Sequence, residues 1–365
     1  MTDVPAKSLA SRASRRSILK GLGAAAIGIS LSSKTRKAWA AEEPKLNFYN
    51  WDTYIGETTL EDFKDASGIN VNMSLFATND ELFAKLRAGN PGYDVIVPGS
   101  EFVERMIQAD LLEPLDHAKI PNIKNIAPEF INDAPYDPGR KFSMPYTWLV
   151  IGIGYRKSKV KGVPDSWKYL FDSDQYKGRI AVMSDASELF RNCFKYLGHS
   201  INDTSPELIK QAEALLIKQK PNIKSFHEDN GQDLLASGEV DVVMEYNGDI
   251  AQVMAEDDDL DFVVPKEGAM KQSDTLAIPK GAPHPENALK FINFILDAKV
   301  GAEISKTIKY PSPNAAAVAL MPASYRDNPV IFPPAEIMAK CEYPRYLGPE
   351  FTRLLDDAMT RLRAA

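Results

Sequence analysis

Strand-like and helix-like segments alternate in the chain after residue 44. The strand-like segments are rich in β-branched and aromatic side chains, and the helix-like segments carry apolar residues three or four apart. The alternating segments, in order, are 45–49, 58–67, 69–76, 79–88 and 93–97. Because this order requires right-handed crossovers and a mostly parallel sheet, it predicts an α/β fold.

The first 40 residues have the order of an export signal. Basic residues between Lys7 and Lys20 precede the apolar run 21–31, and Ala38-Trp39-Ala40 offers a small-x-small cleavage site. The apolar run is too short to span a bilayer, and it is uniformly apolar rather than striped like an amphipathic anchor. The segment around Arg15-Arg16 resembles a twin-arginine motif. We expect residues 1–40 to be removed, with cleavage near Ala40-Ala41.

The remaining chain is acidic. Residues 41–365 hold 35 Lys and Arg against 49 Asp and Glu, a formal net charge of −14. This charge argues against a nucleic-acid partner and is compatible with the attraction of cationic solutes. The length is sufficient for two lobes, each with its own core. Only Cys193 and Cys341 occur, so disulfides do not build the fold, and we do not expect a bridge between them.

The segment 144–155, MPYTWLVIGIGY, is unusually long and apolar for a strand. A strand of this length can pass from one lobe into another, and Gly152 and Gly154 permit bending or close backbone approach. We interpret it as a hinge crossing, with a single long core strand as the alternative. This predicts one lobe from 41–149 and 275–318, and a second from 150–274 and 319–365. The final helix, from about 349 to 362, is expected to pack on the second lobe.

Polar and aromatic side chains follow several of the predicted strands. Trp51, Asp52 and Tyr54 follow the first strand, and Tyr246 and Asp249 follow the strand 239–246. Ligands of open α/β sheets bind outside the carboxyl ends of strands, so these groups could line a pocket. The alternative is that Trp51 and Tyr54 belong to the core and that Asp52 only caps a turn.

Further acidic side chains are candidates for the site, and some of them have a competing explanation as helix caps. Asp185-x-x-Glu188 fits a capping box, and the motif alone favours capping over ligand binding. Ser100 and Glu101 are pocket candidates at another strand end, although capping of the next helix by Ser100 explains them as well. Asp274 heads a strand, 273–279, that we place in the first lobe.

Other polar segments do not indicate catalysis or metal binding. We read 114–141 as surface loop, and the acidic run 256–259 as a solvated loop rather than a metal site. The sequence has neither a Gly-x-Ser-x-Gly elbow nor a His-Glu-x-x-His motif, and its four histidines lie singly in contexts that suggest the surface. We expect no metal and no cofactor. An exported hydrolase using a carboxylate pair, such as Asp185 with Glu188 or Asp249 with Asp274, is the alternative from a different class.

Several blocks of the chain, in the same order from end to end, resemble the polyamine-binding receptors of bacterial ABC importers, the spermidine- and putrescine-binding proteins. The blocks are NFYNW at 47–51, DVIVP at 94–98, MPYxW at 144–148, GIGY at 152–155, VPKEGA at 264–269, LAIP at 276–279, FINF at 291–294 and YPSPN at 310–314. The resemblance implies a two-lobed periplasmic binding protein fold of type II, in which hinge closure encloses the ligand. It also implies a periplasmic monomer that delivers its ligand to an ABC permease driven by a cytoplasmic ATPase.

Carried over by position, the resemblance implies a ligand site of rings and carboxylates. Aromatic faces suit the methylene segments and the cationic ends of a polyamine, and carboxylates bind its ammonium groups. For Asp185 and Glu188 this favours binding, which can coexist with capping. The implied residues are Trp51, Asp52, Tyr54, Asp185, Glu188, Tyr246, Asp249, Asp274 and Tyr310, with Ser100, Glu101, Gln272 and Arg345 as further candidates.

The chain departs from the family pattern at several of these positions. Tyr246 stands where relatives commonly have tryptophan, Gln272 where they have a second large aromatic residue, and Gly99 where a serine is usual. Glu101 stands near an aromatic position of spermidine receptors, and Pro344 or Arg345 near a glutamine. We therefore expect a wetter, less aromatic pocket that binds putrescine or spermidine, and Asp249 matches putrescine-type receptors. Another cationic ligand stays possible in the same fold, and an opine-like or amino-acid ligand would require a basic residue such as Arg345 or Arg191 in the cleft.

Overall fold

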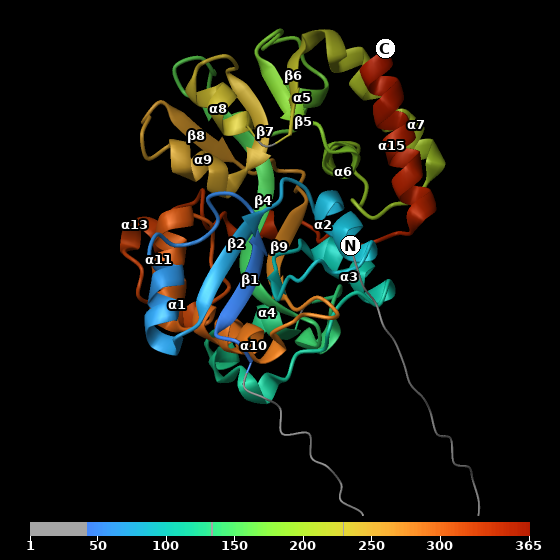
Figure 1. The fold of residues 1–365 in the computed structure, drawn as a ribbon. Coiled ribbons are helices and arrows are strands. Elements are labelled where there is room, and N and C mark those ends of the chain that lie inside the picture. The colour runs from blue at the N-terminus through green and yellow to red at the C-terminus, as the bar shows by residue number, and fades with distance from the viewer. Residues whose placement is uncertain (1–41, 133, 229) are drawn as a thin grey trace, which may run out of the picture. The chain divides into compact units, whose positions relative to one another are not determined.

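A mixed β-sheet organises the part of the chain that the structure describes, residues 42–365 without 133 and 229. In this computed structural model nine strands of that part join in the order β2-β1-β3-β9-β4-β7-β5-β6, and β8 pairs with β4 (Figure 1). The expected export signal and its cleavage site lie outside the described residues. The strands are β1 Lys45–Asn50, β2 Asn70–Leu75, β3 Val95–Ile96, β4 Ser143–Arg156, β5 Ile180–Met183, β6 Ile223–His227, β7 Val242–Tyr246, β8 Leu260–Val263 and β9 Lys271–Ala277.

The predicted strand and helix alternation is confirmed at the start of the fold. β1 pairs in parallel with β2 and β3, and helices α1 (Thr59–Ser67) and α2 (Asn79–Arg87) form the two crossovers. Gly68 ends α1 in the left-handed conformation, with φ of 74°, which glycine adopts at little cost. The expectation of a mostly parallel sheet holds only in part, because the pairs that involve β4 and β9 are antiparallel.

β4 belongs to two groups of strands at once. Its first half, Ser143–Val150, pairs with β9, whereas Ile151–Arg156 pairs with β7 and β8 (Figure 1). The two glycines of β4 lie where other segments approach closely: a Cβ on Gly152 would lie 2.4 Å from Phe262 Cζ and 2.6 Å from the carbonyl oxygen of Val263. The strand therefore runs between two packed regions.

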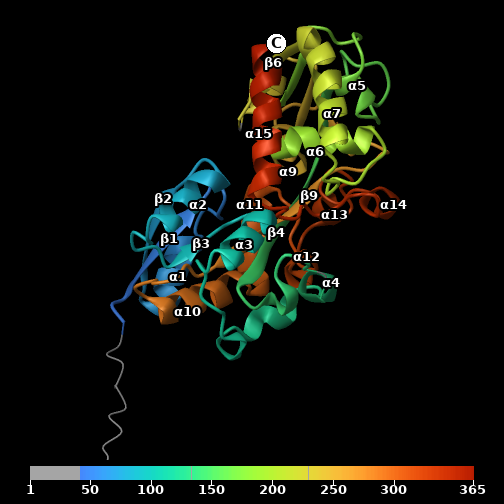
Figure 2. The same ribbon diagram turned by 90° about the vertical axis from the view of Figure 1, so that its right-hand side faces the viewer.

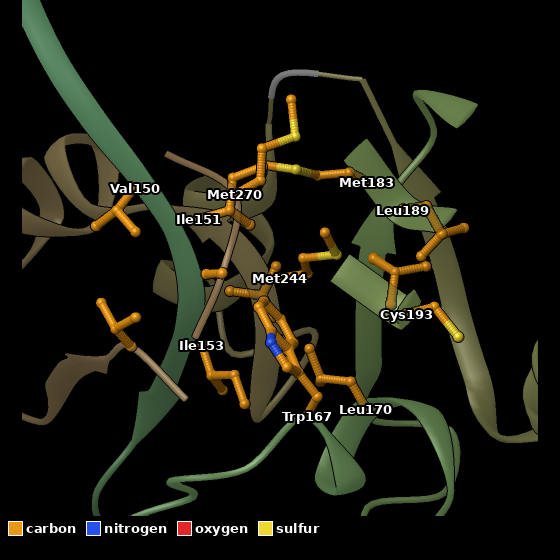
Figure 3. Close-up of a cluster of buried hydrophobic side chains, with 14 of the residues drawn as sticks. Val150, Ile151, Ile153, Trp167, Leu170, Met183, Leu189, Cys193, Met244 and Met270 are labelled. Atoms are coloured by element: carbon orange, nitrogen blue, oxygen red, sulfur yellow. The ribbon is translucent and has the colours of Figure 1, made fainter. Parts of the chain in front are cut away.

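Hydrophobic side chains gather in separate cores on the two sides of the middle of β4. The first side holds residues between 46 and 149 together with residues between 276 and 310. The second holds residues between 150 and 270 together with residues between 302 and 362. Figure 3 shows part of the second core, where Trp167 and Leu170 lie close to Ile153 of β4 and Met244 of β7.

The C-terminal helix packs on the second core, as the sequence predicted. Helix α15 (Pro349–Ala364) buries Phe351, Leu355 and Met359 and lies beside α7 (Pro206–Gln219; Figures 1 and 2). The other helices are α3 Ser100–Gln108, α4 Pro128–Asn132, α5 Lys168–Phe171, α6 Ala186–Tyr196, α7 Pro206–Gln219, α8 Gly231–Ala236, α9 Asn247–Val253, α10 Pro285–Ile295, α11 Ala298–Ile308, α12 Ala315–Val318, α13 Ala323–Arg326 and α14 Ala335–Met338. Short 3₁₀ helices occupy His117–Lys119, Pro121–Asn125, Pro138–Arg140 and Lys220–Asn222.

Several local predictions were wrong. The stretch 114–141 holds α4 and three 3₁₀ helices, so it is more ordered than a plain surface loop. Asp274 lies inside β9 and not at its head, because pairing with β4 begins at Lys271. His227 is buried at the end of β6, a strand that the sequence analysis did not identify, and this burial lowers its pKa to about 4.

Cys193 and Cys341 are both free and buried. Across the described ranges, no helix combines the length and the apolar character that crossing a membrane requires.

Candidate functional site

A cleft of about 540 Å³ lies where β1 and β7 end and where α3 and α6 begin. The residues that line the cleft come from segments that contribute to the cores on both sides of β4. Glu101 and Gln272 line it, whereas Ser100 and Arg345 do not. The structure also brings together here all nine residues that the resemblance implied: Trp51, Asp52, Tyr54, Asp185, Glu188, Tyr246, Asp249, Asp274 and Tyr310.

A buried carboxylate forms the floor of the cleft. Asp274 is only 7% exposed, and its Oδ2 accepts a hydrogen bond of 2.8 Å from the Tyr54 hydroxyl. Because that hydroxyl has one proton, the Thr147 hydroxyl at 2.5 Å must donate to Tyr54. Burial raises the pKa of Asp274 to about 6, although the Tyr54 hydrogen bond acts in the opposite direction. The floor is thus a carboxylate that a bound cation would stabilise in its ionised form.

Aromatic rings stand beside this carboxylate. The rings of Tyr54 and Tyr310 meet edge to face with centroids 5.2 Å apart. Tyr310 fits against the start of α9 only because residue 248 is glycine, since a Cβ there would lie 2.4 Å from the Tyr310 ring. Burial, together with the neighbouring Asp249 carboxylate, raises the pKa of Tyr310, so this phenol stays protonated.

Trp51 and Asp52 form another part of the lining. The Trp51 indole N–H donates to the carbonyl oxygen of Val97 at 2.9 Å, and its ring contacts Phe76 with centroids 4.3 Å apart. Trp51 is half-buried, so it both packs on the core and faces the cleft. Asp52 is exposed, and its Oδ1 accepts from the Thr53 N–H at 2.8 Å, which is the turn-capping role that the sequence allowed.

Asp185 and Glu188 combine capping with a position in the cleft. Asp185 caps α6 by accepting the Glu188 N–H at 2.9 Å. The Glu188 carboxylate extends into the cleft, where it accepts hydrogen bonds from the Tyr246 hydroxyl and, at 3.2 Å, from the Gln272 amide. The capping prediction is therefore confirmed for Asp185, while Glu188 joins α6 to β7 and β9.

The basic candidates are engaged by the protein itself. Arg191 is 1% exposed and donates to Glu101 Oε1 at 3.0 Å, and Arg345 donates to Glu104 Oε1 at 2.7 Å. Ser100 is the first residue of α3 and Gly99 is the cap, so the prediction of a Ser100 cap was wrong. The Ser100 hydroxyl is buried and finds no hydrogen-bond partner among the described residues.

Sequence reasoning missed one wall of the cleft. This wall comes from α2, α3, the segment before α15 and α15 itself, and it includes Asn79, Phe102, Arg105, Tyr346, Phe351, Leu355 and Asp356. None of these residues follows a strand of the sheet, so the strand-end rule could not find them. The one related prediction was that the last helix packs on the second lobe, which is compatible with the position of α15 in the cleft lining.

One strand, β4, connects the two packed regions of the sheet, and an acidic and aromatic cleft lies at the strand ends. This is the arrangement of the two-lobed periplasmic binding protein fold. Residues 58–333 match the model of the family described as bacterial extracellular solute-binding protein. The chain belongs to this family.

Individual relatives agree with this assignment. The putrescine-binding periplasmic protein PotF of Escherichia coli (strain K12) is 35% identical, over 89% of this chain and 93% of the relative. A spermidine/putrescine-binding periplasmic protein of Salmonella typhimurium is 33% identical, over 95% and 97%. The crystal structure of PotD, the substrate-binding protein of a spermidine/putrescine ABC transporter from Streptococcus pneumoniae, is 31% identical with a TM-score of 0.79, over 88% of this chain and 98% of that one. These relatives are binding proteins, so the chain is a solute-binding protein and not an enzyme.

Proposed function

We propose that the protein captures a polyamine, putrescine or spermidine, between its two lobes and delivers it to an ABC permease driven by a cytoplasmic ATPase. The names of the relatives support this ligand class. The acidic chain, with a formal net charge of −14 for residues 41–365, suits a cationic solute.

The observation that carries the proposal is the floor of the cleft. There Asp274 is buried, is hydrogen-bonded by a neutral tyrosine, and lies near the rings of Tyr54 and Tyr310. An ammonium group would supply the positive charge that such a carboxylate lacks, and the rings would contact the adjoining methylenes. An opine-like or amino-acid ligand is less suited, because Arg191 and Arg345 are already paired with glutamates and Arg105, which lines the cleft, is paired with Asp80.

Calorimetry with the purified protein tests this function. We expect stoichiometric binding of putrescine or spermidine and no binding of an acidic amino acid such as glutamate. Asp274→Ala should weaken polyamine binding by about 2 kcal/mol or more, the scale for leaving a buried cation without its partner. Asp110→Asn, which alters an exposed carboxylate outside the cleft, is the matched control and should bind like the wild type. Unchanged affinity in Asp274→Ala would remove Asp274 from the site.

We further propose that residues 1–40 are a cleaved, twin-arginine-like signal and that the mature protein acts as a periplasmic monomer. The order of basic, apolar and small residues supports export, and the relatives are periplasmic proteins. Amino-terminal sequencing of the exported protein should begin near Ala41, and Arg15→Lys with Arg16→Lys should leave uncleaved precursor. A mature protein that starts elsewhere would contradict the proposed cleavage site.

The lobe boundaries are part of the same proposal. We assign 41–149 and 275–318 to the first lobe, and 150–274 and 319–365 to the second. The separate cores support the division at residue 149, and hinge closure between the lobes would then enclose the ligand. Small-angle scattering with and without ligand should show a more compact form when ligand is bound.

A further inference from the structure

A chain of hydrogen bonds links β4 to the buried carboxylate on the floor of the cleft. The Thr147 hydroxyl donates to the Tyr54 hydroxyl at 2.5 Å, and Tyr54 donates to Asp274 Oδ2 at 2.8 Å. Thr147 is 1% exposed and does not line the cleft, whereas Tyr54 and Asp274 do. An effect of the Thr147 hydroxyl on a ligand would therefore pass through Tyr54.

An irregularity in β4 brings two consecutive residues onto Tyr54. The pairing of β4 with β9 shifts by one residue between Pro145 and Thr147, which leaves Tyr146 as an extra residue. Neighbouring side chains of a regular strand point to opposite faces, and a bulge breaks this alternation. Here Thr147 contacts the Tyr54 hydroxyl, while the Tyr146 hydroxyl donates to the Tyr54 carbonyl oxygen at 2.8 Å. The bulge thus holds Tyr54 at its backbone and at its hydroxyl.

Two further contacts fix the position of Tyr54. The amide of the buried Asn50 side chain donates to the Tyr54 carbonyl oxygen at 2.9 Å. The rings of Tyr54 and Tyr146 meet edge to face, with centroids 5.5 Å apart. The Tyr54 hydroxyl therefore has little freedom to leave the line between Thr147 and Asp274.

The hydrogen bonds of this chain have a fixed direction when Asp274 is ionised. A carboxylate only accepts, so Tyr54 donates to it, and the Tyr54 oxygen accepts from Thr147. A hydroxyl that accepts a hydrogen bond is a stronger donor, because linked hydrogen bonds polarise one another. Among residues 42–365 without 133 and 229, no group donates to the other carboxylate oxygen, Asp274 Oδ1. Thr147 strengthens the bond to one oxygen of Asp274 and leaves the other for a ligand.

We propose that Thr147 is a positioning residue of the ligand site: it commits the Tyr54 proton to Asp274 Oδ2, so that Asp274 Oδ1 accepts from an ammonium group of the ligand. The inference rests on the proposed polyamine function. It adds a residue outside the cleft lining to those that determine the affinity for the ligand.

Other titratable groups surround the hydrogen-bonded chain. Burial raises the pKa of the phenols of Tyr54, Tyr146 and Tyr310, so these groups stay protonated. The charged side chains that other elements bring to the cleft near its floor include Asp52, Glu101, Asp185, Glu188 and Asp249, and Arg191 pairs with Glu101. All of them are the same in the wild type and in variants of Thr147. The ratio of the two affinities at one pH therefore reports on the hydrogen-bonded chain.

Thr147→Val tests the inference, because it replaces the hydroxyl by a methyl group of similar size. In the ligand-free protein the pKa of Asp274 should rise, since the hydrogen bond that stabilises the carboxylate weakens, and carbon-13 NMR of the side-chain carboxyl measures this. Calorimetry should show putrescine binding about three- to tenfold weaker than in the wild type at pH 6. The loss should be smaller at pH 8, where Asp274 is largely ionised in both proteins. Thr147→Ser keeps the hydroxyl and should restore the pKa and the affinity.

A double-mutant cycle separates positioning from a general structural effect. Tyr54→Phe removes the hydroxyl through which Thr147 acts, so adding Thr147→Val to Tyr54→Phe should cause no further loss of putrescine affinity. Thr275→Val is the matched control: it removes the hydroxyl of another buried threonine, which donates to the Pro98 carbonyl oxygen at 3.1 Å, and it should leave the affinity at both pH values unchanged. Equal losses from Thr147→Val with and without Tyr54→Phe would overturn the positioning role.

The pKa of Asp274 is measured without ligand, so the two proposals can fail separately. An unchanged pKa or an unchanged affinity in folded Thr147→Val would overturn the positioning role and leave the polyamine function intact. A wild type that binds neither putrescine nor spermidine would contradict the proposed function, and the role of Thr147 in ligand binding would fall with it. If Thr147→Val does not fold, Thr147→Ala makes the same deletion with a smaller side chain.

Discussion

Asp274 is a buried carboxylate that destabilises the ligand-free protein. Burial raises its pKa from 3.8 to about 6. Between these two pH values the folded state holds a proton that the unfolded state has lost, so the free energy of unfolding falls as the pH rises through this window. The full penalty is present above pH 6. This loss of stability is the free energy needed to hold an ionised carboxylate in a buried position where it can bind a cation.

Replacing this carboxylate should stabilise the protein in a pH-dependent way. Asp274→Asn keeps an oxygen that accepts from Tyr54 and removes the charge, so we expect the free energy of unfolding to rise by on the order of 2 kcal/mol at pH 7 and by little at pH 4. Urea denaturation of the ligand-free protein at both pH values measures this. An equal change at both would show that the gain does not come from the charge, and Asp110→Asn is the control.

The two roles of Asp185 can also be separated at the scale of one residue. Asp185→Ser keeps a side-chain acceptor for the Glu188 N–H at the start of α6, whereas Asp185→Ala removes it. We expect Ala to cost about 1 kcal/mol of stability and Ser to cost little, because both serine and aspartate are good caps. Both variants should lose polyamine affinity, since both lose the charge. Thermal melts measure the stability of both variants, and calorimetry measures their polyamine affinity. Wild-type affinity in Asp185→Ser would mean that Asp185 acts only as a helix cap.

At the scale of elements, β4 depends on the absence of side chains at its glycines. A Cβ on Gly152 would lie 2.6 Å from the Val263 carbonyl oxygen, and this backbone atom of the paired strand cannot move aside without breaking the ladder. We expect Gly152→Ala to lower the free energy of unfolding by about 1 to 3 kcal/mol, the usual cost of overpacking.

Gly99→Ala is the comparison for this prediction. Gly99 has φ of −67°, and the nearest atoms to its Cβ position, at 3.2 and 3.3 Å, are the ends of the Gln272 and Asn79 side chains. These ends can shift, so the stability of Gly99→Ala should stay close to that of the wild type. Chemical denaturation measures the free energy of unfolding of both variants. Equal losses of stability would mean that crowding at Gly152 does not cause the loss in Gly152→Ala.

At the scale of the whole molecule, the charge balance should govern how fast a cation arrives. With a net charge of −14 for residues 41–365, association should slow as salt screens the attraction. Stopped-flow fluorescence, with Trp51 in the cleft as the reporter, should show an association rate that falls between about 20 mM and about 300 mM NaCl while the dissociation rate changes less. A loss of affinity that comes mainly from faster dissociation would contradict this view.

The pattern of the sequence was sufficient for the framework of the fold. Periodicity located α1 and α2, because each buries apolar residues on one face. Apolar segments bounded by turn-forming residues such as Gly68 indicated β1 and β2, although no side chain of β2 is fully buried. The long apolar run with Gly152 and Gly154 indicated a crossing strand, because a strand shared by two packed regions is buried along almost its whole length. The strand-end rule indicated Trp51, Tyr54 and Tyr246, which all line the cleft.

Other features were decided only by tertiary structure. Whether Glu188 caps a helix or enters the cleft depends on Tyr246 and Gln272, which are 58 and 84 residues away in the chain. The burial of His227 follows from β6, a short strand whose position is set by its neighbours and not by its own pattern. The pairing of Glu101 with Arg191 joins two helices 90 residues apart, and no local pattern encodes such a distance. The sequence alone determined which side chains end the strands, and the folded chain decided which of them meet in one cleft, because those contacts join residues far apart in the chain.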